Sequence, residues 1–598
     1  MKPETAIIIC IYMNLMTKLK KIICGNIPEI LILSVCLMIF VYYAGEKEGY
    51  HMDELLSFEL SNAEFTPWIV PTQPEGRLEK FVKNELRDDK GNLVFGRLTE
   101  ALSDVLQNRK ASKLLSYRAD VYDEPVWIGA DEFKDYITVG DGDAFNYLSV
   151  YFNVKDDNHP PLHFMLLHTV SSVFKGKVRP WMGCVINISA VMIIMICLFR
   201  TGRLICPGAA GRVTGGLSAL MYGLGAGAIS SVLLNRMYGL LTMWCMLTLY
   251  LHIRRYREGF NGKELILTAV TVLGFLTQYF FLFYCISLAV TMTVILLLEK
   301  RTAELLVYIR TMLISAAAGL ILFPFAISDV FTSGRGVEAL GNLSEGLTGY
   351  GERLKGFLEL MIWRNMGPAP LIAACFGMIL CVLRLARRKD MYGKGALVML
   401  TVIPVAVYFA FVSRMAPYIV DRYVMPIFPV MALLSAGSIE FIKKELEFHK
   451  DRFMRVMTYV ISGIAVLGAF LCGCRGGGEY LYKGYAYQEA MSKELSYLPC
   501  LCIYEGYGYY ENLIEFTNYK ETLLLRTKEL SGRKVLTDIT DKDEMAVLIK
   551  QNADAEKVDG ILRDRYGFVQ SSENLLAESV YGDRLYIYRI ADTNETDK

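Results

Sequence analysis

Several titratable side chains gather in the segment Asp-Asp-Asn-His-Pro-Pro-Leu-His-Phe, residues 156–164, directly before an apolar stretch. Asp157 and His159 in this segment have the acid–base chemistry of a catalytic site. The same residues also suit a helix start, because Asp and Asn cap helices well and proline fits the first helical turn. The segment alone leaves both interpretations open, so the choice depends on which other polar residues meet it.

A second polar group, Asp53 and Glu54, follows the first long apolar segment within Gly-Tyr-His-Met-Asp-Glu-Leu-Leu. An acidic pair at this position is either the solvated start of a helix or a carboxylate held close to a membrane surface. In the second case, the carboxylate could accept the proton of a hydroxyl group beside a lipid head group.

Two arginines complete the set of chemically suitable residues. Arg236, followed by Met and Tyr238, lies between two closely spaced apolar segments, and Arg422 and Tyr423 precede another. A buried arginine is costly unless its charge is paired, so Arg236 either binds an anion or only reaches out to lipid head groups. If these groups converge, the arginines would grip a lipid phosphate while a carboxylate activates a hydroxyl. A polyprenyl phosphate would then be the leaving group of a sugar transfer.

The elements that must position these residues are membrane-spanning helices. The 598 residues are 53% hydrophobic and 21% charged, with a mean hydropathy of +0.32, and this composition excludes an ordinary soluble protein. The sequence predicts a polytopic α-helical membrane protein with about 11 apolar stretches long enough to cross the hydrocarbon core. These stretches are residues 26–44, 181–199, 213–232, 237–253, 264–279, 281–298, 311–328, 366–383, 396–412, 424–440 and 456–474.

The distribution of charge orients the predicted spans. Basic residues gather before the first span and in four later loops, at 200–212, 254–257, 384–389 and 443–455. Because basic loops face the cytoplasm, the N-terminus is expected there and the acidic loop 45–158 outside. This orientation requires that the short apolar stretch 162–174 lies on the outer surface without crossing. If it crossed, two basic loops would lie on the wrong side.

The chain is expected to divide into a transmembrane module, residues 1–474, and an extracytoplasmic tail, residues 475–598. Strand-like runs at 497–504, 545–550 and 584–590, with a helical pattern at 554–566, predict a small α/β domain in the tail. The tyrosines of its Tyr-Gly-Tyr-Tyr stretch are either core residues or a surface that stacks on sugars. The 14 cysteines lie mostly in apolar spans and indicate no disulfide framework.

Four local patterns together carry a resemblance to a known family. They are the acidic pair after the first span, His-Pro-Pro-Leu at 159–162, Arg-Met-Tyr at 236–238, and Arg-Tyr followed by Pro-x-x-Pro at 422–429. This combination resembles the C-type membrane glycosyltransferases, in the branch that contains the protein O-mannosyltransferases and the lipid A aminoarabinose transferase. The resemblance covers residues 20–440.

The resemblance implies that Asp53 is the catalytic base, with Glu54 beside it. The implied donor- and phosphate-binding residues are His159, Arg236, Tyr238, Arg422 and Tyr423, supported by Asp157. The implied reaction moves a sugar from a polyprenyl-phosphate donor to a hydroxyl of a cell-surface acceptor, at the lipid bilayer and without a nucleic acid partner. No metal cofactor is expected, although the carboxylates could ligate a divalent cation. The first loop is longer than is usual in the family, so the resemblance carries no acceptor specificity.

Two other functions stay open at this point. A transporter of a lipid-linked substrate would also keep charged groups at the membrane, but transporters usually contain internal repeats or paired broken helices, which the sequence does not display. A polymerase or ligase of cell-surface glycans would concentrate its arginines in one large late outer loop. Here the acidic pair comes in the first loop.

Overall fold

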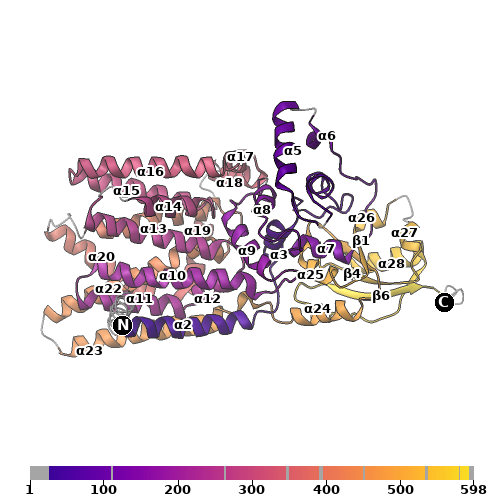
Figure 1. The fold of residues 1–598 in the computed structure, drawn as a ribbon. Helices are drawn as coiled ribbons and strands as arrows, with labels where there is room; N and C mark the ends of the chain where they lie inside the picture. Colours follow the sequence, from indigo (N-terminus) through magenta and orange to yellow (C-terminus); the bar gives the residue numbers. More distant parts are fainter. Residues whose placement is uncertain are drawn as a thin grey trace, which may run out of the picture.

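A bundle of helices and a β-sheet occupy opposite ends of the computed structural model (Figure 1). The structure describes residues 26–66, 68–89, 91–108, 112–155, 157–260, 264–344, 349–388, 395–448, 452–532, 537–577 and 579–591. All the predicted site residues lie within these ranges, whereas Asp156 of the 156–164 segment lies outside them.

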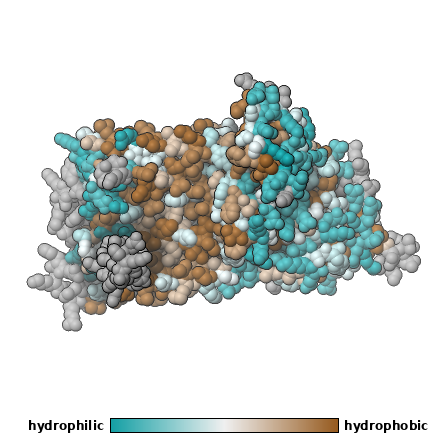
Figure 2. Space-filling model, viewed as in Figure 1, coloured by the Kyte–Doolittle hydropathy of each residue, from teal (hydrophilic) through white to brown (hydrophobic). Residues whose placement is uncertain are grey.

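The helices of the bundle run side by side (Figure 1). They are α2 (Ile27–Gly45), α10 (Trp181–Ile205), α11 (Ala209–Leu224), α12 (Ala226–Leu233), α13 (Tyr238–Glu258), α14 (Leu265–Phe275), α15 (Phe281–Leu298), α16 (Thr302–Leu322), α20 (Pro368–Arg388), α21 (Ala396–Met415), α22 (Phe428–Phe448) and α23 (Arg452–Gly476). In the described part of the chain, 7 helices are long and apolar enough to cross a membrane, or 8 if the bent pair α11–α12 is one span. Figure 2 shows a hydrophobic belt across the visible face of the bundle, as expected of a multi-pass membrane protein.

The predicted number of spans is only partly confirmed. The stretch 213–232 is broken at Gly225 into α11 and α12, which are bent by 58°. The stretch 264–279 forms only the 11-residue helix α14. The stretch 237–253 lies in α13, which is long enough but not apolar enough for a span. The stretch 366–383 lies mostly in α20, whose described apolar part, Pro368–Ile379, is shorter than a span. Most residues of α13 are buried inside the bundle, where the helix contacts protein rather than lipid and can therefore carry polar residues, which lowers its hydropathy.

The helix that begins within the 156–164 segment is short. Helix α9 (Leu162–Val173) has 12 residues, so it measures about 18 Å, less than the hydrocarbon thickness of a bilayer. It packs against α3 (Met52–Asn62) at the end of the bundle that faces the sheet, called the sheet end below (Figure 1). This length agrees with the expectation that residues 162–174 do not cross, while the orientation of the chain stays a prediction.

Short helices gather mainly at the sheet end. They are α4 (Arg77–Phe81), α5 (Phe95–Asn108), α6 (Lys113–Ser116), α7 (Ala130–Ile137), α8 (Tyr147–Asn153), α17 (Ala326–Phe331), α18 (Gly334–Ser344), α19 (Tyr350–Met361), the π-helices η1 (Val82–Leu86) and η3 (Ile362–Met366), and the 3-10 helices η5 (Asp421–Tyr423), η6 (Met425–Ile427) and η7 (Glu479–Leu481).

The sheet has its strands in the order β1-β3-β2-β4-β6-β5. Strand β2 (Cys500–Tyr504) runs parallel to β3 (Glu521–Arg526) and β4 (Glu544–Ile549). Strand β6 (Arg584–Ile590) is antiparallel to β4 and β5 (Phe568–Gln570). The tail also contains η8 (Gly508–Asn512), α24 (Tyr485–Glu494), α25 (Leu513–Phe516), α26 (Thr527–Leu530), α27 (Thr537–Thr540) and α28 (Ala555–Tyr566). The small α/β domain predicted for the tail is therefore present.

The first loop and the tail share structure. Strand β1 (Ile128–Gly129), from the first loop, pairs antiparallel with β3 of the tail. Tyr50 and Phe58 of the first loop lie in one hydrophobic core with Tyr509 and Tyr510 of the tail. The last two residues belong to the Tyr-Gly-Tyr-Tyr stretch and are core residues. Because loop and tail share a core, α3 is held firmly between the bundle and the sheet.

Candidate active site

Helix α3 begins with a capping box that sets the directions of its two acidic side chains. His51 is the N-cap residue, and its Nδ1 accepts a hydrogen bond from the Asp53 N–H at 3.0 Å. The Glu54 carboxylate accepts a hydrogen bond from the His51 N–H at 2.5 Å. This pattern is local, because the His51 ring satisfies the N–H of the second helical residue and Glu54 satisfies the N–H of His51.

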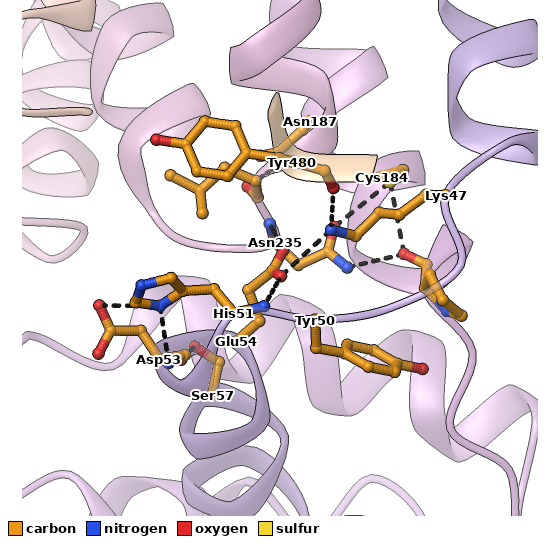
Figure 3. Close-up of polar contacts among 12 residues, drawn as sticks. Lys47, Tyr50, His51, Asp53, Glu54, Ser57, Cys184, Asn187, Asn235 and Tyr480 are labelled. Atoms are coloured by element: carbon orange, nitrogen blue, oxygen red, sulfur yellow. Dashed lines mark hydrogen bonds and ion pairs between the residues drawn. The ribbon is translucent and has the colours of Figure 1, made fainter. Parts of the chain in front are cut away.

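Glu54 points into the protein (Figure 3). Its side chain is completely buried and forms an ion pair with Lys47 Nζ at 3.1 Å. Its other oxygen accepts a hydrogen bond from the Asn235 N–H at 2.5 Å. Glu54 therefore ties the segment after α2 to the turn before α13, and both of its oxygens are engaged inside the fold.

Lys47 connects this network to the start of the tail. Its Nζ donates to the carbonyl oxygen of Tyr480 at 2.7 Å, and Figure 3 shows the two residues meeting beside Glu54. The Tyr480 hydroxyl donates to Asp421 Oδ1 at 2.6 Å. Asp421 directly precedes Arg422 in the chain. Tyr480, which lies between the bundle and the tail, therefore contacts two parts of the candidate site, at Lys47 and beside Arg422.

Asp53 points away from Lys47, to the other side of α3 (Figure 3). Its side chain is 23% exposed, and its Oδ2 accepts a hydrogen bond from Arg422 Nη1 at 2.6 Å. Burial raises the pKa of Asp53, but the charges of Arg236 and Arg422 outweigh burial and lower that pKa to about 2. Asp53 is therefore ionised at neutral pH.

Arg422 is held between two aromatic rings. Its guanidinium carbon lies 5.9 Å from the ring centre of Tyr238 and 5.6 Å from that of Tyr423. Both tyrosines are buried, and their rings attract the cation. The structure thus places these predicted donor-binding residues around the arginine, where they orient its side chain.

Arg236 approaches α3 from the turn before α13. Its Nη1 donates to the Asp53 carbonyl oxygen at 2.9 Å and to Ser57 Oγ at 2.7 Å. The Nε atoms of Arg236 and Arg422 are buried without a hydrogen-bond partner within the described ranges. Two positive charges therefore meet at Asp53, and neither guanidinium uses all of its donors.

Asp157 and His159 join the cluster from the segment before α9. Asp157 Oδ2 lies 2.9 Å from His159 Nδ1, within hydrogen-bond distance. Burial raises the pKa of Asp157, but the neighbouring His159 and Arg236 outweigh burial and lower it. His159 also contributes to the low pKa of Asp53, so the two carboxylates belong to one electrostatic cluster.

The fold thus brings the predicted site residues together at the sheet end of the bundle. Sequence reasoning missed the residues that connect them, which are Lys47, His51, Ser57, Asn235 and Tyr480. The capping pattern of His51 and Glu54 was visible as a local signal. Lys47 and Tyr480 are 433 positions apart, and no local pattern relates them.

The described residues contain no group of 3 or more His, Cys, Asp or Glu side chains arranged to hold a metal ion. Asp53 and Glu54, two of the carboxylates considered as ligands, point to different sides of α3 (Figure 3). They are therefore not placed to share one cation.

Comparisons with known proteins identify the fold. No protein-family model and no curated protein matches the sequence. The crystal structure of ArnT from Cupriavidus metallidurans bound to undecaprenyl phosphate matches at a TM-score of 0.51 and 11% identity, over 94% of this chain and 98% of that chain. The AglB oligosaccharyltransferase from Archaeoglobus fulgidus matches at a TM-score of 0.40 and 12% identity, over 90% of this chain and 71% of that chain.

The mycobacterial arabinofuranosyltransferase AftD matches at a TM-score of 0.40 and 12% identity, over 85% of this chain and 41% of that chain. The fold assignment depends on ArnT, because that match extends over nearly the whole of both chains. The chain has the fold of ArnT, in agreement with the fold expected from the resemblance to the C-type membrane glycosyltransferases.

Proposed function

We propose that the protein is a membrane glycosyltransferase that moves a sugar from a polyprenyl-phosphate donor to a hydroxyl of a cell-surface acceptor. The observation that carries this proposal is Asp53, an ionised, partly exposed carboxylate bonded to Arg422 and close to Arg236. The fold of ArnT, whose structure contains undecaprenyl phosphate, supports a lipid phosphate as the anion that these arginines bind.

Asp53 is the general base in the proposed reaction. It removes the proton from the acceptor hydroxyl while the hydroxyl oxygen attacks the anomeric carbon of the sugar. The bond between the anomeric carbon and the phosphate oxygen breaks, the configuration inverts, and polyprenyl phosphate leaves. Arg422 and Arg236 stabilise the negative charge that develops on the leaving phosphate.

The low pKa of Asp53 makes it a weak base in the free protein, because two arginines stabilise its ionised form. A bound phosphate would bring negative charge to both guanidinium groups and compete with Asp53 for Arg422. Both effects raise the pKa of Asp53. The base is therefore strengthened when the donor is in place.

The other residues serve to position this pair of groups. Glu54 is completely buried and engaged with Lys47 and the backbone, so we assign it to holding α3 rather than to touching the substrate. Tyr238 and Tyr423 orient Arg422, and His159, with Asp157 behind it, faces the donor. The arginines provide the positive charge that a divalent cation would bring, and we therefore propose catalysis without a metal.

The proposed orientation puts the N-terminus in the cytoplasm and the site and tail outside. The basic loops predicted from the sequence support this orientation. In it, the sheet end of the bundle faces the cell surface, where a lipid-linked donor presents its sugar.

The test is to incubate the purified full chain in detergent with a panel of polyprenyl-phosphate sugars. Release of polyprenyl phosphate, by transfer to an added acceptor or by slow hydrolysis, is expected for at least one donor, and about 100-fold or more slowly for Asp53→Asn. If the parent chain binds every donor without turnover, and sealed vesicles that contain it take up the donor, the protein is a transporter rather than an enzyme.

A further inference from the structure

Helix α5 carries an apolar stripe that the rest of the described protein leaves uncovered. Phe95, Leu102 and Leu106 are 76%, 55% and 80% exposed. Residues spaced by seven and four positions lie on one side of a helix with 3.6 residues per turn. Large apolar side chains gathered on one exposed face indicate an interaction surface.

The neighbouring side of α5 fixes the helix to the protein. Leu98 and Ala101 pack on a small core that includes Phe81 and Phe152. The opposite side is polar, as expected of an amphipathic helix. The helix is therefore held in place by one part of its apolar surface, while the stripe of Phe95, Leu102 and Leu106 stays free.

The core beneath α5 is joined to the end of a membrane span. Phe152 belongs to α8, and the hydroxyl of the adjacent Tyr151 donates to the carbonyl oxygen of Leu322 at 3.0 Å. Leu322 is the last residue of α16, one of the helices that are long and apolar enough to cross the membrane. This contact sets α5 near the level at which α16 leaves the hydrocarbon.

The direction of α5 completes the geometry. Figure 1 shows α5 running across the direction of the bundle helices and projecting beyond the side of the bundle. A helix in that direction lies parallel to the plane of the membrane. Figure 2 shows hydrophobic side chains on the edge of this projection that faces the belt of the bundle. The apolar side of α5 therefore faces the lipid that surrounds the belt of the bundle.

We propose that α5 is an interfacial helix that inserts Phe95, Leu102 and Leu106 between the lipid head groups of the bilayer around the bundle. Amphipathic helices bind in this way, with the apolar face at the boundary of head groups and acyl chains. The contact anchors the first loop, and with it the start of α3, at a defined height above the membrane. This inference does not depend on the proposed glycosyltransferase activity.

The test uses the full chain in phosphatidylcholine vesicles, with a fluorescent label on single introduced cysteines. Leu102→Cys and Leu106→Cys report the stripe, and their neighbours Ser103→Cys and Gln107→Cys are matched controls on the polar side. The exposed Cys375 and Cys474 are replaced by serine, and residual labelling of that parent is subtracted. Phe95→Cys provides a further stripe position if one variant fails to fold.

Labels on the stripe should lose most of their emission when the vesicles contain chain-brominated phosphatidylcholine, and should resist aqueous iodide. Labels at 103 and 107 should show the reverse. Iodide quenching on both faces would mean that α5 stands in water, which overturns the proposal. Protection of the stripe from both quenchers would mean that a protein surface covers it, such as a second copy of the chain, and would also overturn it.

Discussion

Asp53 and Glu54 are neighbours in the chain, yet the two sides of α3 on which they lie differ in almost every physical respect. On the buried side, Glu54 is fully enclosed and accepts hydrogen bonds from Lys47, His51 and Asn235. On the open side, Asp53 keeps 23% of its side chain exposed and contacts Arg422. Consecutive residues point about 100° apart on a helix, so one carboxylate supports the fold and the other keeps capacity for chemistry.

The largest expected effect concerns the open side. Asp53→Asn keeps the shape of the side chain and an oxygen for Arg422, but the amide cannot accept the hydroxyl proton. Turnover should therefore fall by roughly 100- to 10,000-fold, the usual contribution of a general base, with donor binding kept. The measurement is the rate of sugar transfer at saturating donor.

The matched control for this change is Asp141→Asn, because Asp141 is fully exposed and its ion pair is with Lys175, outside the cluster. It should leave turnover unchanged. Normal turnover in Asp53→Asn, with donor binding intact, would show that Asp53 is not the general base. The open side of α3 would then have no part in the proposed mechanism.

On the buried side, Glu54→Gln should act mainly on stability. Removing one partner of a buried ion pair typically costs about 3–5 kcal/mol, because the other charge is left without compensation. The melting temperature in detergent should fall clearly, while the protein that remains folded should still transfer sugar. A stable Glu54→Gln protein with no turnover would contradict the contrast between the two sides.

The double variant Lys47→Met with Glu54→Gln sharpens the same point. It removes the unpaired lysine charge as well, so part of the lost melting temperature should return. No recovery would mean that the hydrogen bonds to His51 and Asn235, rather than the ion pair, carry the stability.

A smaller effect is expected from the arginine on the open side. Arg422→Lys keeps the charge but loses the planar fork that can hold two phosphate oxygens. Hydrogen bonds to charged groups contribute about 1.5–3 kcal/mol, so the apparent affinity for the donor should weaken by about tenfold or more. Arg563→Lys, on an exposed surface of the tail, is the control. Unchanged affinity in Arg422→Lys would mean that this arginine binds only Asp53.

The smallest effect tests the link between the two sides. Tyr480→Phe removes the hydrogen bond to Asp421 and should loosen the adjacent Arg422. The pKa of Asp53 should then rise from about 2 towards its ordinary value of 3.8. Since a carboxylate is protonated below its pKa, the protonated form should appear at higher pH than in the parent.

Infrared spectra of the carboxylic acid band measure this shift, with Asp53→Asn identifying the band. Tyr497→Phe, at an exposed tyrosine, is the control. If Tyr480→Phe lowers the melting temperature while the midpoint for Asp53 stays in place, the tyrosine supports the fold without acting on the site.

Much of the bundle was predictable, because hydropathy over a window of about 20 residues is a local property. The predicted span 213–232 shows the limit of this reasoning. Its composition is apolar throughout, but the chain bends at Gly225, where an added Cβ would lie 2.5 Å from the carbonyl oxygen of Asn365. That contact joins residues distant in the sequence, so hydropathy carries no sign of it.

The sheet shows the same limit. The patterns of β2, β4 and β6 were recognisable as strands, whereas β3 and β5 were missed. Strand β1 has only 2 residues and exists because Ile128 and Gly129 meet β3 across more than half of the chain. Two residues are too few to show the alternation of apolar and polar side chains, so only the pairing with β3 defines this strand.

For the candidate site, residue types and local spacing were enough to select Asp53, Arg236 and Arg422. Charged groups beside apolar segments cost free energy unless they are paired or bind a ligand. Residue types and local spacing were not enough to separate Asp53 from Glu54. That separation depends on Lys47 and on the Asn235 N–H, which enclose one carboxylate, and on Arg422, which approaches the other from 369 positions away. Burial and charge pairing are properties of the packed molecule, and they decide which carboxylate stays open to a substrate.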